Sequence, residues 1–149
     1  MSQNLTGGCQ CGKIRYKVTS SPLTCYCCHC TECQAQSASA FGVSVRVDNQ
    51  AIKISGNPSS YWRDNGKSTE VECLFCPDCG TRLIHRRNAS AASASIKGGS
   101  LDAGCKVTPV GHIWTGSKQE WMIFPKDHLV CEGQPDDGYD ALIERFRES

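Results

Sequence analysis

Seven of the twelve cysteines in this 149-residue chain lie in three closely spaced groups. The groups are Cys9 with Cys11, Cys76 with Cys79, and Cys28 with Cys30 and Cys33. Thiolates at these spacings can reach one metal ion, and zinc is commonly held by such ligands in a tetrahedral arrangement. The residue types and their spacing therefore predict metal binding as the chemistry of this chain.

The two cysteine pairs together supply four thiolates, the number that closes a tetrahedral zinc site. Cys76-Pro-Asp-Cys79-Gly80 has the form of a zinc knuckle, in which Gly80 can take a positive φ after the second ligand. Glycines also stand on both sides of the Cys9 and Cys11 pair. We predict one structural zinc site built from the two pairs, with free thiols as the alternative.

The group of three offers one ligand fewer. Cys28, Cys30 and Cys33 would leave the fourth corner of a zinc ion for water or substrate, as catalytic zinc sites do. Three thiolates carry three negative charges, so their complex with Zn²⁺ has a net charge of −1. Such a complex lowers the pKa of bound water less than a zinc site with neutral ligands would. An incoming thiol would still lose its proton on binding. The group therefore predicts a reactive site suited to thiol chemistry.

The alternative is a second closed structural site. Cys25 or Cys27 would complete the tetrahedron, and Glu32 and His29 are also near in sequence. Because His29 lies between two ligands, we expect its side chain to point away from the metal.

Composition and charge limit the kinds of partner that this chain is expected to bind. The formal net charge of +1 argues against a dedicated nucleic-acid surface, which is usually strongly basic. The polar N-terminus has no apolar signal segment, and no run approaches the roughly 18 apolar residues that a membrane span needs. We therefore expect a cytoplasmic protein, in which clustered cysteines bind metal more often than they form disulfides.

Alternation of apolar and polar residues dominates the chain and predicts a mainly β fold. The predicted strands cover residues 13–18, 41–47, 51–54, 61–63, 69–75 and 81–85, with a short strand near Ile96. Asp64-Asn65-Gly66 predicts a hairpin turn.

One helix is predicted over about 137–147, where apolar residues recur at helical spacing and Asp136 or Asp137 can cap the first turn. No linker divides the chain, so we expect a single zinc-binding domain over 1–149.

The cysteine groups and their surroundings resemble the glutathione-dependent formaldehyde-activating enzyme family, which shares its domain with centromere protein V. The matching stretches are 8–16, 28–33, 75–81, 99–102 and 109–114. The resemblance covers about 7–124, which leaves the predicted helix in a C-terminal extension. It implies a zinc-containing β-tent fold and two zinc ions per chain.

The resemblance also implies ligands and a reaction. It places the structural zinc on Cys9, Cys11, Cys76 and Cys79, and the catalytic zinc on Cys28, Cys30 and Cys33. The implied activity is that of a carbon–sulfur lyase similar to S-(hydroxymethyl)glutathione synthase. Such an enzyme adds a thiol such as glutathione reversibly to a small aldehyde such as formaldehyde. The alternatives are a non-catalytic zinc-stabilised binding module and a glutathione carrier.

Two residues of the 109–114 stretch are candidates for the site. His112 is a candidate proton donor, because an ordinary histidine pKa of about 6.5 suits that task. Trp114 is a candidate wall of the substrate pocket. A histidine bonded to a backbone carbonyl and a tryptophan packed in the core are the respective alternatives. Gln34 departs from the family pattern, which often has a basic residue after the third cysteine. That departure bears on how a glutathione carboxylate would be held.

Overall fold

The computed structural model describes residues 4–64 and 70–149. They form two compact units. Unit 1 consists of the segment that ends at Pro22 together with Arg46–Lys106, and unit 2 consists of Leu23–Val45 and Val107–Ser149. Each unit contains one cysteine cluster, so the two are described separately. The single domain expected over 1–149 stays a prediction.

Unit 1 contains a three-stranded antiparallel sheet of β1 (Leu5–Gly8), β2 (Arg15–Val18) and β5 (Ile52–Ser55), with β2 in the centre. The side chains of Tyr16 and Val18 are buried, whereas Arg15 and Lys17 are exposed. This is the period-2 alternation that predicted a strand here.

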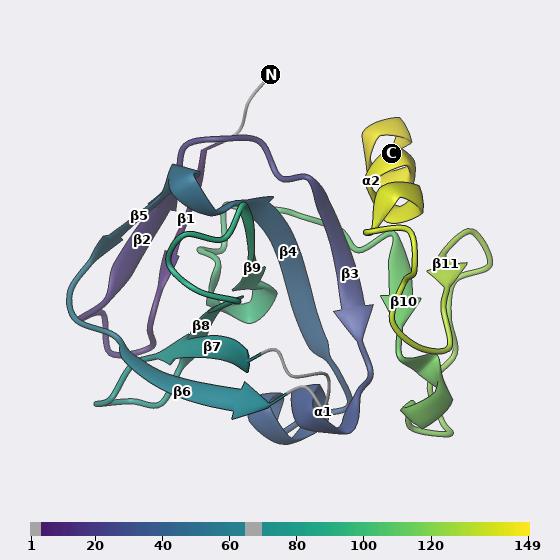
Figure 1. Cartoon of the computed structure of the whole chain (residues 1–149), viewed down its shortest axis with the longest axis horizontal. Helices are drawn as coiled ribbons and strands as arrows, with labels where there is room; N and C mark the ends of the chain where they lie inside the picture. Colours follow the sequence, from purple (N-terminus) through teal and green to yellow (C-terminus); the bar gives the residue numbers. More distant parts are fainter. Residues whose placement is uncertain (1–3, 65–69) are drawn as a thin grey trace. The chain divides into compact units, whose positions relative to one another are not determined.

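The second sheet segment of unit 1 is an antiparallel series of β6 (Ser59–Asp64), β7 (Glu70–Phe75), β8 (Arg82–Arg86) and β9 (Ser93–Lys97) (Figure 1). The β6–β7 pairing agrees with the predicted hairpin, whose turn residues 65 and 66 lie outside the described residues. The register of β7 against β8 shifts between Leu74 and Phe75. Such an irregularity bends a strand and re-aims the residues that follow, here the first cysteine of the knuckle.

Unit 2 contains three parallel strands, β3 (Thr24–Cys28), β10 (Gly111–Ile113) and β11 (Leu129–Val130), with β10 in the centre. Every residue of β3 is buried. The C-terminal helix α2 (Asp140–Glu148) packs on this strand. The hydroxyl of Thr24 donates to the carbonyl of Leu142 at 2.9 Å, and the ring of Tyr26 stacks on that of Tyr139 with centroids 5.3 Å apart.

Three short 3₁₀ turns and two further elements complete the described part of the chain. The turns are η1 (Asn49–Ala51), η2 (Gly98–Ser100) and η3 (Thr115–Ser117). Helix α1 (Thr31–Ser37) follows β3, and β4 (Gly42–Asp48) begins in unit 2 and ends in unit 1. The predicted C-terminal helix begins at Asp140, later than expected, and the Asp137 carboxylate accepts hydrogen bonds from the N–H groups of Tyr139 and Ala141.

The mainly β class and the short C-terminal helix predicted from the sequence are confirmed. Over residues 4–64 and 70–149, no helix is both long enough and apolar enough to cross a membrane.

Candidate metal centres

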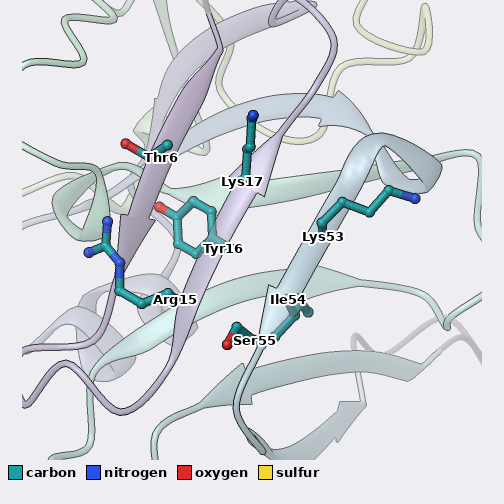
Figure 2. Close-up of a pocket in the computed structure, with 7 residues that line it drawn as sticks. All are labelled: Thr6, Arg15, Tyr16, Lys17, Lys53, Ile54 and Ser55. Carbon is teal, nitrogen blue, oxygen red and sulfur yellow. The ribbon is translucent and has the colours of Figure 1, made fainter.

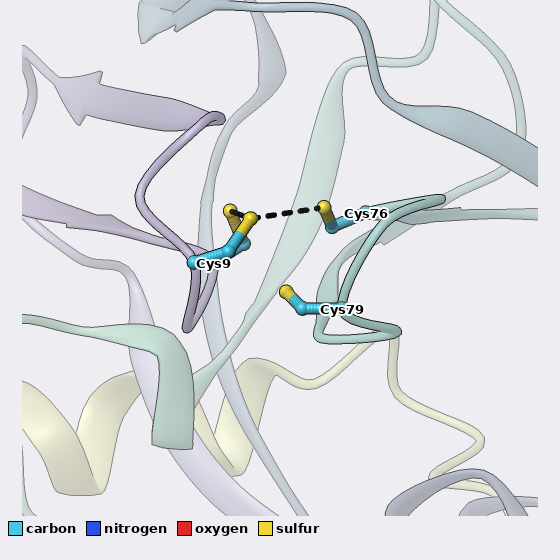
Figure 3. A group of neighbouring side chains, drawn as sticks. Cys9, Cys76 and Cys79 are labelled. Carbon is cyan, nitrogen blue, oxygen red and sulfur yellow. Dashed lines mark hydrogen bonds between the residues drawn. The ribbon is translucent and has the colours of Figure 1, made fainter.

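Unit 1 brings the two cysteine pairs together at one point. The sulfur atoms of Cys9, Cys11, Cys76 and Cys79 all lie within 4.8 Å of one another. Figure 3 shows the sulfurs of Cys9, Cys76 and Cys79 directed toward one small space. The Sγ atom of Cys11 lies 3.5 Å from that of Cys9 and 3.7 Å from that of Cys76. Sulfurs in a tetrahedral zinc site are separated by about 3.8 Å when each Zn–S bond is about 2.3 Å. The four thiols therefore fit a zinc ion.

Two similar turns present these thiols. The N–H of Cys9 bonds to the carbonyl of Ile14 at 3.0 Å, and the N–H of Cys76 bonds to the carbonyl of Thr81 at 3.0 Å. The second turn closes with the N–H of Gly80 donating to the Cys76 carbonyl at 2.8 Å. Gly80 has a φ of 79°, the left-handed conformation expected for the residue after a knuckle.

Hydrogen bonds to sulfur favour the thiolate forms of Cys9 and Cys79, whereas the neighbouring thiols raise the pKa of Cys11 to about 12. The N–H of Ile14 points at the Cys9 sulfur at 3.2 Å. The hydroxyl of Thr81 lies 3.3 Å from the Cys79 sulfur and accepts from the N–H of Gln10 at 3.0 Å, so Thr81 links the two turns. The hydroxyl and the backbone of Thr81 together lower the pKa of Cys79 to about 5. A low thiol pKa suits a metal ligand, because the thiolate is the form that binds.

Unit 2 brings the group of three together. The sulfurs of Cys28, Cys30 and Cys33 lie within 4.8 Å of one another. Cys28 ends β3, Cys30 is the N-cap of α1, and Cys33 lies in the first turn of that helix. The Cys30 sulfur accepts a hydrogen bond from the backbone N–H of Cys33 at 3.2 Å, which holds the Cys30 side chain against the first turn of the helix. Cys28 and Cys33 are buried, and Cys30 is half-buried.

The three thiols cannot all ionise without a compensating cation. Hydrogen bonds with Cys30 and Cys33 raise the pKa of Cys28, and burial raises it further. A divalent ion would supply the missing charge, so the donor set fits a metal. Among the described residues, no fourth cysteine, histidine or acidic side chain belongs to this cluster. Cys25 and Cys27, the alternatives that would close the site, are buried in β3 outside the cluster.

A row of three imidazoles lies beside this cluster. The Nε2 atom of His29 is 3.0 Å from Nδ1 of His112, and Nε2 of His112 is 3.0 Å from Nδ1 of His128. His29 is fully buried between two cysteines of the group, as expected for a side chain that points away from the metal. Its Nδ1 has no hydrogen-bond partner among the described residues. The sequence offered only His112 as a proton donor, because its contacts with His29 and His128 depend on the pairing of β10 with β3 and β11 rather than on any local motif.

The middle ring of this row is neutral at physiological pH. His112 is buried and its ring stacks on Phe124 with centroids 4.0 Å apart. Burial, together with the neighbouring rings of His29 and His128, lowers the pKa of His112 to about 4. Both of its ring nitrogens face other imidazoles, so His112 is not paired with a backbone carbonyl through either of them.

Trp114 follows β10 and is about one-third exposed. Its φ of 56° is a left-handed conformation that residues other than glycine rarely adopt. The indole N–H donates to the Gln134 side-chain oxygen at 3.1 Å, and the Gln134 amide donates to the Tyr139 hydroxyl at 2.7 Å. The ring is therefore fixed at its polar edge and accessible over part of its surface.

Gln34 ties the cysteine group to the end of η3 and the residues that follow it. Its amide nitrogen donates to the carbonyls of His29 and Ser117, both at 2.8 Å, and its oxygen accepts from the Gln119 amide at 2.7 Å. The hydroxyl of Ser117 also donates to the His29 carbonyl at 2.9 Å. Lys118, between Ser117 and Gln119, was not identified from the sequence. Its Nζ atom lies 5.8 Å from the centroid of the Phe124 ring.

A pocket of about 350 Å³ lies in unit 1 (Figure 2). It is shallow and lies on the sheet of β1, β2 and β5. Its cationic residues are Arg15, Lys17 and Lys53, and Arg15 forms an ion pair with Asp102. The pocket contains no cysteine or histidine, so we give it no part in the chemistry of the metal centres.

Comparison with known proteins places this chain in context. A family model described as glutathione-dependent formaldehyde-activating enzyme matches residues 4–117, which include all seven clustered cysteines together with His112 and Trp114. The fold is similar to the crystal structure of a Rhodobacter sphaeroides protein, with a TM-score of 0.53 and 15% sequence identity. That similarity covers 85% of this chain and 98% of the other.

Proposed function

This chain belongs to the glutathione-dependent formaldehyde-activating enzyme family, and we propose that it is a zinc-dependent carbon–sulfur lyase that adds a thiol such as glutathione reversibly to a small aldehyde such as formaldehyde. The observation that carries the proposal is the cluster of Cys28, Cys30 and Cys33, which has no fourth protein ligand among the described residues. Three protein ligands and a free position are the arrangement of catalytic zinc sites.

The proposed ligands divide between two zinc ions. Cys9, Cys11, Cys76 and Cys79 would hold the structural ion, and Cys28, Cys30 and Cys33 the catalytic one. Zinc bound by the group of three would supply Lewis-acid stabilisation of a thiolate at neutral pH. We propose a reducing compartment such as the cytoplasm, because these ligands must remain thiolates.

The reaction requires one proton to change place. The thiol sulfur forms a bond to the aldehyde carbon, the carbonyl π electrons move to oxygen, and that oxygen takes a proton while the thiol proton leaves. The product is a hemithioacetal. We propose His112 as the proton donor, acting through a neighbouring ring. Because both of its nitrogens are occupied by other imidazoles, its proton would pass through His128, the half-buried end of the row. The exposed face of Trp114 would form a wall of the substrate pocket.

The proposal is tested by following exchange between ¹³C-formaldehyde, glutathione and their adduct by NMR, together with zinc content per chain. We expect wild-type protein to bind two zinc ions and to accelerate the exchange. Cys30→Ser should lose one zinc ion and the acceleration. Cys105→Ser, a cysteine outside both clusters, should keep both.

Two results would point elsewhere. Binding of glutathione without faster exchange would make the protein a carrier. Two tightly held zinc ions indifferent to thiols, with a Cys30→Ser variant that does not fold, would favour a binding module.

A further inference from the structure

Lys118 lies in a segment that is hydrogen-bonded to residues flanking the candidate catalytic cluster. Its Nζ atom lies over the Phe124 ring, and the Phe124 ring lies 5.3 Å from the ring of His29. His29 in turn stands between two of the three clustered cysteines.

This lysine has no acidic partner within the described residues. It is half-buried, and its contact is with the face of an aromatic ring. Among residues 4–64 and 70–149, no carboxylate forms an ion pair with Lys118. A partly desolvated ammonium without a counter-ion is a favourable position for an anion, because charge-assisted hydrogen bonds are the stronger class.

The backbone around Lys118 is held in place by side-chain hydrogen bonds. Gln34 donates to the carbonyl of Ser117 and accepts from Gln119, the residues on either side of the lysine. The N–H of Lys118 itself bonds to the carbonyl of Thr115 at 3.1 Å. The same Gln34 amide bonds to the carbonyl of His29, so the lysine segment and the cysteine group share one anchor.

We propose that Lys118 is a specificity-determining residue that binds the carboxylate of the thiol substrate, and that Gln34 is the positioning residue that holds it beside the cysteine group. This inference rests on the proposed function and narrows it to thiols that carry a carboxylate. It also gives Gln34 a role: the glutamine positions a cation that another segment of the chain supplies.

The test compares two thiols of nearly equal size, 3-mercaptopropionate and its uncharged amide, 3-mercaptopropionamide. Dissociation constants are measured by calorimetry on the zinc-loaded full chain. We expect the wild type to prefer the carboxylate. Lys118→Gln should weaken binding of the carboxylate by about ten- to hundred-fold and leave the amide unchanged. Lys118→Arg should retain part of the preference, and Lys126→Gln, an exposed lysine of the same unit, should retain all of it.

The role of Gln34 is tested by a double-mutant cycle. Gln34→Ala should reduce the preference for the carboxylate, and Lys118→Gln should then cost less than it does in the wild type. Additive effects of the two substitutions would overturn the positioning role. Zinc content and thermal unfolding of each variant show whether the cysteine group and the fold are retained.

The outcomes separate this inference from the proposed function. If both thiols bind the wild type and Lys118→Gln weakens them equally, or weakens neither, the role of Lys118 is wrong while the thiol site stands. If neither thiol binds the wild type, the proposed function fails and this inference fails with it.

Discussion

His112 is the central member of a row of three imidazoles, and its protonation state decides what the row can do. A neutral imidazole has one N–H donor and one acceptor nitrogen. The two 3.0 Å contacts of His112 are therefore both satisfied when the three rings share the same tautomer. Moving a proton along the row would reverse all the tautomers together. A charged His112 would have to donate to both neighbours at once.

The low pKa of His112 predicts a pH dependence. Its pKa falls to about 4 from an ordinary 6.5, because the ring is buried and lies next to His29 and His128. Below pH 6.5 the unfolded chain binds a proton that the folded chain does not. The contribution of this residue to the free energy of unfolding is therefore complete above pH 6.5 and decreases as the pH falls toward 4.

The measurement is an NMR titration of the imidazole nitrogens of the zinc-loaded protein. We expect the His112 signals, identified by their loss in His112→Gln, to remain those of a neutral ring down to pH 5. A midpoint near 6.5 would contradict the prediction.

At the scale of elements, α1 is the short helix that carries Cys33. It has seven residues and is followed by its C-cap Ala38, whose φ of 51° and ψ of 40° are left-handed. The N–H of Ala38 bonds to the carbonyls of Ala35 and Gln34, which closes the helix at its C-terminus. Glycine is the usual residue at such a position, because it lacks the Cβ atom that makes the conformation costly.

Ala38→Gly is therefore expected to stabilise the protein. Glycine removes the steric cost of a left-handed alanine, but it also has more conformational freedom to lose on folding. The difference leaves a gain of about 0.5–1 kcal/mol in the free energy of unfolding. Ala35→Gly is the matched control, since Ala35 is exposed inside the same helix and should lose about 1 kcal/mol. Urea unfolding at constant zinc measures both. Equal losses in the two variants would contradict the prediction.

The way in which an element is buried determines whether its sequence could predict it. Strands with one buried face, such as β2, alternate in polarity and were predicted in place. Every residue of β3 is buried, so its sequence carries no alternation and gave no strand signal. Helix α1 is too short for helical periodicity, and its N-cap is a cysteine, a residue that does not usually mark a helix start.

The contacts of the candidate site also differ in whether the sequence could predict them. The spacing of Cys28, Cys30 and Cys33 is local, so the sequence was sufficient to expect that they meet. The contact of His29 with His112 joins residues 83 positions apart, through the parallel pairing of β3 with β10. No local pattern encodes that register. The position of Lys118 depends on the hydrogen bonds of Gln34 in the same non-local way.

At the scale of the whole molecule, each compact unit contains one cysteine cluster. The four-cysteine cluster joins turns of unit 1, and the three-cysteine cluster lies in unit 2. A structural zinc site contributes on the order of 10–16 kcal/mol in small modules, which is comparable to the whole stability of a typical domain. Loss of one ligand from the four-cysteine cluster therefore removes a large part of the stability of the unit that holds it.

We predict that the two clusters protect different parts of the chain from hydrogen exchange. In Cys76→Ser, exchange should increase throughout β7 and β8 of unit 1, because Cys76 is fully buried and its turn ends β7. In Cys30→Ser, the increase should be limited to α1 and β3 of unit 2, because an open three-ligand site stabilises its surroundings less. Amide exchange by mass spectrometry measures both variants, with Cys105→Ser as the control. A uniform increase over the whole chain in both variants would contradict the prediction, and would mean instead that residues 1–149 unfold together as the single domain expected from the sequence.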